Sequence, residues 1–133
     1  MQRTILANEV PDGGPIPWAV QLQGFSWEDP ARLVQTLTGA ILGCGGWVLS
    51  RGSSDTGTVT MLFEFERRLC VDVYSVLVAA GVELSQAGHL RFTELCQCTI
   101  LSPQELGHQI ASIDLEIQTA HDECGVRPNC VRT

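Results

Sequence analysis

Residues 18–48 read WAVQLQGFSWEDPARLVQTLTGAILGCGGWV, and they combine a strand pattern, a helix start, a helix end and the beginning of a second strand. At the start of this stretch, Trp18, Val20 and Leu22 alternate with alanine and glutamine. An apolar residue at every second position predicts a half-buried β-strand over residues 18–25.

A helix is predicted after this strand. Asp29 is a suitable N-cap, and Pro30 fits the first helical position, where a missing N–H group costs nothing. The apolar residues that follow recur at spacings of three and four, which is typical of a helix with one buried side. Gly45 and Gly46 end the pattern, since glycine readily adopts the left-handed conformation found after helices.

Downstream of this helix, the sequence predicts a hairpin and a second helix. Residues 47–51 and 58–65 form two extended runs, joined by the turn-forming residues 52–57. Residues 66–80 return to a helical pattern that Gly81 ends. Val71 and Val78 lie off its apolar stripe, so a strand remains an alternative there.

The last third of the chain predicts a strand and a C-terminal helix. Residues 90–99 alternate, with polar groups on both sides, as in an edge strand. Ser102 and Glu105 form a capping box around Pro103. Four apolar residues then follow at spacings of four, three and four, which predicts an amphipathic helix with one apolar side: Leu106, Ile110, Ile113 and Ile117.

Together these elements predict an α+β fold of ferredoxin-like βαββαβ topology, with a four-stranded antiparallel sheet and an added C-terminal helix. The expected organisation is an N-terminal arm (1–17), the ferredoxin-like domain (18–100), the helix (101–121) and a flexible tail (122–133). Trp18 and the row Met61, Phe63 and Phe65 suggest that both sheet faces are apolar. A second copy or the C-terminal helix is therefore expected to cover the second face, and the chain is predicted to form a homo-oligomer, in its simplest form a dimer.

Composition excludes several classes of function. The net charge is −7 and all eight cationic side chains are arginines, so binding to nucleic acid is not expected. Arg67 and Arg68 are the one local cluster of cations, and we interpret them as a solvated helix start beside two glutamates. No apolar run is long enough to span a membrane, and the N-terminus lacks a secretory signal, which predicts a cytoplasmic protein with six reduced cysteines.

The turn after the first strand resembles the opening of an ACT domain. ACT domains are ferredoxin-like regulatory modules that commonly bind amino acids at a subunit interface. In their acidic-x-Pro-Gly-x-Leu turn, Glu28, Pro30 and Leu33 match, whereas Ala31 replaces the preferred glycine and Gly45 falls one residue late. The resemblance implies a homodimer that binds an amino acid or small carboxylate at this turn through Gly24, Ser26, Glu28, Asp29, Pro30 and Ala31.

The sequence contains no convincing metal or catalytic motif. His121, Cys124 and Cys130 have the right donor types for zinc, but their spacing matches no paired-ligand motif, and neither a metal nor a cofactor is expected. Two alternatives to ligand binding remain. One is an interaction or oligomerisation domain without a small ligand. The other is a dimeric α+β barrel enzyme with His89, at the mouth of the last strand, as its acid/base.

Overall fold

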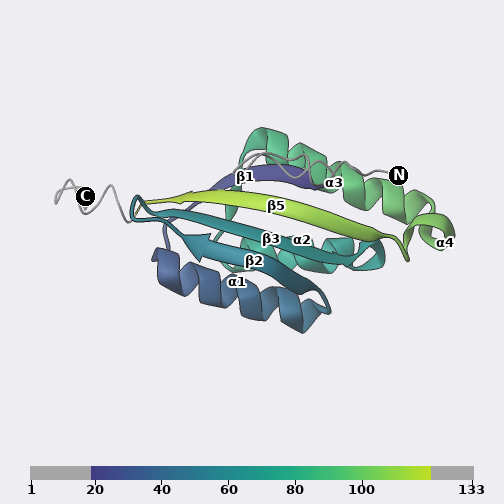
Figure 1. Cartoon of the computed structure of the whole chain (residues 1–133). Coiled ribbons are helices and arrows are strands. Elements are labelled where there is room, and N and C mark those ends of the chain that lie inside the picture. The colour runs from purple at the N-terminus through teal and green to yellow at the C-terminus, as the bar shows by residue number, and fades with distance from the viewer. Residues whose placement is uncertain (1–18, 121–133) are drawn as a thin grey trace, which may run out of the picture.

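The computed structural model of the chain describes residues 19–120, which form an α+β fold with a five-stranded sheet (Figure 1). The α+β class predicted from the sequence is confirmed. The elements in chain order are β1 (Val20–Ser26), α1 (Pro30–Cys44), β2 (Trp47–Ser53), β3 (Thr58–Glu66), the 3₁₀ helix η2 (Arg67–Leu69), α2 (Cys70–Ala79), β4 (Glu83–Leu84), α3 (Gln86–Leu101), α4 (Pro103–Leu106) and β5 (Ile110–Thr119).

The strand order is β2-β3-β5-β1-β4, and the sheet is mixed. β5 pairs antiparallel with β3 on one side and parallel with β1 on the other. β2 pairs antiparallel with β3, and the two-residue β4 pairs antiparallel with β1. The prediction of a four-stranded, purely antiparallel ferredoxin-like sheet is therefore wrong, because the final strand inserts between β1 and β3.

The first half of the fold follows the sequence prediction. The Asp29 carboxylate accepts a hydrogen bond from the Arg32 amide at 3.2 Å, and Pro30 begins α1. Gly45 ends α1 with φ of 100°, a conformation that side chains disfavour. The predicted hairpin forms as β2 and β3, and the segment that was ambiguous between helix and strand is helical in η2 and α2.

Residues 90–99, predicted to be a strand, lie within α3 instead. The buried residues of this segment do not alternate as they would in a strand. They are Gly88, Phe92, Cys96 and Thr99, which follow one another at helical spacings of four, four and three. Ser85 caps the start of this helix, because its hydroxyl accepts a hydrogen bond from the Gly88 amide at 3.0 Å. Packing of this side against the sheet overrides the strand-forming side chains.

The predicted C-terminal amphipathic helix is also wrong. Residues 103–106 form the single turn α4, the Ser102 side chain makes no capping hydrogen bond, and residues 110–119 form β5. The apolar residues of β5 alternate along the strand, since Ala111, Ile113, Leu115 and Ile117 are all buried in the core. A residue such as Ile113 fits both a helical and a strand pattern, and pairing on both sides of β5 selects the strand.

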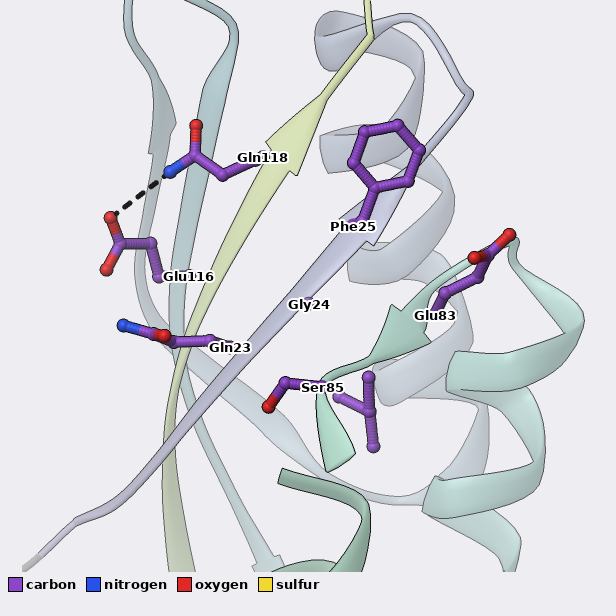
Figure 2. A pocket seen from close by; sticks show the side chains of 8 residues that line it. Gln23, Gly24, Phe25, Glu83, Ser85, Glu116 and Gln118 are labelled. Atoms are coloured by element: carbon purple, nitrogen blue, oxygen red, sulfur yellow. Dashed lines mark hydrogen bonds between the residues drawn. The ribbon is translucent and has the colours of Figure 1, made fainter. Parts of the chain in front are cut away.

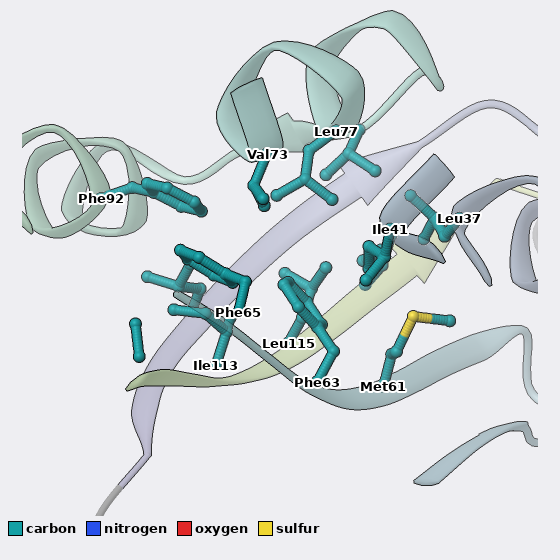
Figure 3. Packing of buried hydrophobic residues seen from close by; sticks show 14 of the residues in the cluster. Leu37, Ile41, Met61, Phe63, Phe65, Val73, Leu77, Phe92, Ile113 and Leu115 are labelled. Carbon is teal, nitrogen blue, oxygen red and sulfur yellow. The ribbon is translucent and has the colours of Figure 1, made fainter. Parts of the chain in front are cut away.

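The helices α1, α2 and α3 cover one face of the sheet, and the hydrophobic core lies between these helices and the sheet (Figure 3). Met61, Phe63 and Phe65 of β3 point into this core and are fully buried. Phe65 stacks on Phe63 and on Phe92 of α3, with ring centroids 6.1 and 6.2 Å apart. This apolar row of β3 therefore faces the helices and does not contribute to the opposite face of the sheet.

The opposite face of the sheet is mostly polar, and the apolar row of β3 that was predicted to make it apolar lies on the helix side instead. Glu64 accepts hydrogen bonds on this face from the indole of Trp47 at 3.0 Å and from the hydroxyl of Ser112 at 2.6 Å. The β3 row therefore no longer argues for a second copy of the chain, and the homo-oligomer stays a prediction. The residues that alternate onto this face from the three central strands are Gln21, Gln23, Phe25, Thr58, Thr60, Leu62, Glu64, Glu66, Ile110, Ser112, Asp114, Glu116 and Gln118.

Some predictions concern residues outside the part of the chain that the structure describes. These are the N-terminal arm (1–17), the placement of Trp18, the tail (122–133), and the residues His121, Cys124 and Cys130, for which no metal site is expected. Among residues 19–120, no helix has both the length and the apolar character that crossing a bilayer requires.

Two glycines give a paired test of the packing: Gly46, at the corner between α1 and β2, and Gly39, within α1. A Cβ atom at the buried Gly46 would lie 2.8 Å from the Glu64 carbonyl oxygen, whereas one at Gly39 of α1 would meet no atom within 4 Å. We expect G46A to lower the free energy of unfolding by about 1–3 kcal/mol through overpacking. G39A should raise it by about 0.5–1 kcal/mol through helix propensity. Urea denaturation measures both changes. If G46A left the free energy of unfolding unchanged, the close packing described for this corner would be contradicted.

Candidate functional site

The first two predicted ligand residues, Gly24 and Ser26, have structural roles in this fold. Gly24 lies in β1 opposite Leu84, and a Cβ atom there would be 2.8 Å from the carbonyl oxygen of Glu83. Only glycine therefore allows β4 to approach β1. Ser26 is fully buried, and its hydroxyl accepts from the Glu28 amide at 3.1 Å.

The N-terminus of α1, where a ligand carboxylate was predicted to bind, is already capped. The Asp29 carboxylate accepts from the Arg32 amide, so an incoming anion would have to displace a like charge. Pro30 is buried beneath the turn, while Glu28 and Ala31 are exposed. Of the six predicted ligand residues, Gly24 alone lines either of the two larger pockets described below.

The first of these pockets, called here the edge pocket, lies where β1, β4 and β5 meet (Figure 2). Its volume is about 490 Å³. Glu83 and Glu116 line it, and no lining residue is cationic, so a carboxylate ligand would be repelled. The complete lining is Gln23, Gly24, Phe25, Glu83, Leu84, Ser85, Glu116 and Gln118.

The second pocket, called here the arginine pocket, lies between the start of β1 and α3 and has a volume of about 480 Å³. It contains two arginines from distant parts of the chain, Arg67 of η2 and Arg91 of α3. A glutamate, a thiol and apolar side chains complete the wall. The lining residues are Ala19, Val20, Gln21, Arg67, Arg91, Glu94, Leu95 and Cys98.

Both arginines are held by neutral acceptors. Arg67 donates from Nε to the Thr99 hydroxyl at 3.1 Å and from Nη2 to the Leu95 carbonyl at 3.4 Å. Arg91 donates from Nη1 to the Gln21 carbonyl at 3.0 Å. Within residues 19–120 neither of them forms an ion pair with a carboxylate; the salt bridge there joins Arg68 and Glu66. The pocket therefore contains two positive charges whose remaining N–H groups can receive an anion.

The outer edge of β1 adds backbone groups to this pocket. β4 pairs with β1 at Gly24 and Phe25, so the preceding residues of the strand have no strand on that side within the described chain. The Gln21 carbonyl points outward to Arg91, and the N–H group of the same residue lies on the same edge of a strand. A smaller pocket of about 250 Å³, lined in part by Gln21, Gln23 and Arg91, continues along this edge.

No catalytic pair is evident in the described residues. His89 lies in the first turn of α3, so its predicted position at the mouth of a last strand is wrong, and its Nδ1 is 2.7 Å from the Tyr74 hydroxyl, outside both larger pockets. A hydrogen bond to Cys96, together with burial, raises the pKa of the Cys70 thiol, which makes it a poor nucleophile at neutral pH. Burial and nearby Asp72 raise the pKa of Cys44 as well.

Comparison with known proteins adds no functional assignment. No protein family, no curated protein and no solved structure matches the chain. In the described part of the chain, no three His, Cys, Asp or Glu side chains are grouped so that they could hold a metal ion.

Asp114, next to the arginine pocket on the polar face, gives a pH-dependent test. Its carboxylate accepts from the Gln21 amide group at 3.2 Å, and partial burial raises its pKa above the ordinary 3.8. A raised pKa means that the folded state binds the proton more tightly, so this group's stabilising contribution is present below pH 3.8 and is lost as the pH rises through the folded pKa.

We therefore expect D114N to be more stable than the native chain at pH 7, with the difference disappearing below pH 3.8. Thermal melts across this pH range measure the difference. A variant that is less stable at pH 7 would show that the ionised carboxylate is favourable in this position.

Proposed function

We propose that this protein is a non-catalytic module that binds a small organic carboxylate, with amino acids included in that class, in the arginine pocket. The observation that carries the proposal is that Arg67 and Arg91 line one pocket and that neither is paired with a carboxylate within residues 19–120. In a chain of net charge −7, a pocket lined by two such cations can attract an anion.

The chemistry of the pocket favours a carboxylate over a neutral ligand. A guanidinium presents a planar fork of N–H donors that matches the two oxygens of a carboxylate. Arg67 is partly buried and fixed by two acceptors, so little side-chain entropy is lost when a ligand binds. Val20 and Leu95 supply apolar surface for the rest of a small metabolite.

This proposal keeps the regulatory, ACT-like role predicted from the sequence but moves the ligand away from the turn at Asp29. The resemblance of that turn to ACT domains stays a prediction, and the site proposed here requires no second copy of the chain. The rival function is an interaction domain without a small ligand. Binding of a defined anion in the arginine pocket distinguishes the two.

The test is thermal melting and calorimetric titration of the whole protein with amino acids, short monocarboxylates and dicarboxylates. A ligand at one hundred times its Kd should stabilise the fold by about 2.7 kcal/mol. R91Q should weaken binding about tenfold or more, because a hydrogen bond from a charged donor contributes roughly 1.5–3 kcal/mol.

R68Q is the matched control, since it removes a neighbouring arginine that pairs with Glu66 and does not line the pocket. It should leave affinity unchanged. Because Arg67 also contacts Thr99, T99V separates the loss of that hydrogen bond from the loss of the charge in R67Q. The proposal would be contradicted if no ligand of the panel bound, or if R68Q and R91Q lost the same amount of binding affinity.

A further inference from the structure

We propose that Cys70 and Cys96 form a redox modification site, in which a hydroperoxide joins the two thiols in a reversible disulfide between α2 and α3. This site does not depend on the ligand of the arginine pocket, so the two proposals stand or fall separately. The observation that carries it is a pair of buried, free cysteines from two helices that are hydrogen-bonded to each other beside a fixed arginine.

Two hydrogen bonds place the start of α2 against α3 at the position of Cys96. Arg67 of η2 donates to the Leu95 carbonyl and to the Thr99 hydroxyl, so its guanidinium is anchored on both sides of Cys96 along α3. Cys70 follows η2 directly, and its N–H group donates to the Arg67 carbonyl. Both cysteines belong to the hydrophobic core, with 2% of Cys70 and 8% of Cys96 exposed. The fold therefore brings together two thiols that are far apart in the chain.

The two thiols have different reactivities. The Cys70 S–H group donates a hydrogen bond to the Cys96 sulfur, which lowers the pKa of Cys96 and raises the pKa of Cys70. Burial opposes the lowering of the Cys96 pKa, and the positive charge of Arg67 adds to it. Cys96 is also the more exposed of the pair. Because the thiolate is the nucleophile, Cys96 is the thiol that reacts with the oxidant and Cys70 is the thiol that resolves the product.

Hydrogen peroxide is the simplest oxidant for this pair. The Cys96 thiolate attacks one peroxide oxygen, the O–O bond breaks, and the second oxygen leaves as hydroxide, which takes up the proton lost by Cys96 and becomes water. The Cys70 thiol then attacks the sulfenic sulfur. The S–S bond forms, the S–O bond breaks, and the hydroxyl group leaves with the Cys70 proton as a second water. The two thiols together lose two hydrogen atoms, and the peroxide is reduced to two molecules of water.

The other two cysteines of the described chain serve as internal comparisons. The Cys44 thiol donates to the Asp72 carbonyl at 3.8 Å, and burial together with Asp72 raises its pKa. Cys98 is exposed and lines the arginine pocket. Residues two positions apart on a helix do not share a side, so Cys98 and Cys96 point in different directions. Oxidation that merely follows exposure would therefore affect Cys98 first.

The test is peptide mapping by mass spectrometry of the full chain after treatment with equimolar hydrogen peroxide. The parent protein is C124S/C130S, in which the two cysteines outside the described residues cannot react. We expect one cross-link, between Cys70 and Cys96, which dithiothreitol reverses. C98S should retain this cross-link. C70S should stop the reaction at the sulfenic acid of Cys96, which dimedone labels, and C96S should form neither product.

Melting curves of the parent protein provide a second measurement. The oxidised form should melt at a higher temperature than the reduced form, because a cross-link that fits the native geometry restricts the unfolded chain. Both measurements use the parent protein, so the proposal stays testable even if a serine variant unfolds. It would be overturned if peroxide oxidised Cys98 and left Cys70 and Cys96 unlinked, if their cross-link formed only in urea, or if the cross-linked protein melted below the reduced one.

Discussion

The insertion of β5 between β3 and β1 is the constraint on which the rest of the structure depends. This strand has hydrogen-bonded neighbours on both sides, and Ile113, Leu115 and Ile117 lie at the centre of the core. Each such side chain contributes roughly 1.5–3 kcal/mol on full burial. Without β5, β1 would have no neighbour except the two residues of β4, and the sheet would divide.

The position of β5 also determines where the arginine pocket forms. Because β5 occupies the inner side of β1, the outer edge of β1 is left to β4 and to α3, which packs against it. The chain reaches β5 through α3, and this connection brings Arg91 and Glu94 beside the start of β1. Arg67 follows directly after β3, next to α3 in space. The arginine pocket is therefore a consequence of the strand order.

Local signals in the sequence were sufficient for the first half of the fold. Asp29, Pro30 and Gly45 act through their own backbone and nearest neighbours, so β1, α1 and the following hairpin could be predicted. The second half depends on distant contacts. Ile113 and Ile117 fit both a helix and a strand, and the apparent capping box at Ser102 favoured the wrong choice. Ala111 and Leu115 were the residues that supported strict alternation.

The candidate site could not be found from the sequence because its two arginines, Arg67 and Arg91, are 24 positions apart and come to one pocket only through α3. Arg67 looked like a solvated helix start beside Arg68, and Arg91 lay in a segment predicted to be extended. One pattern in the sequence does indicate the helix α3. Gly88, Phe92, Cys96 and Thr99 have helical spacing, and a helix there places Arg91 and Glu94 one turn apart.

Native-state hydrogen exchange followed by NMR tests the placement of β5 most directly. In a strand paired on both sides, neighbouring amides donate alternately to the two partner strands, so the amides of Ile113, Leu115 and Ile117 and of the residues between them should all be protected. We predict that they exchange at the rate set by global unfolding, together with Phe63 of β3. Exchange through local opening, with helical carbon chemical shifts across residues 110–119, would contradict this fold and the pocket that depends on it.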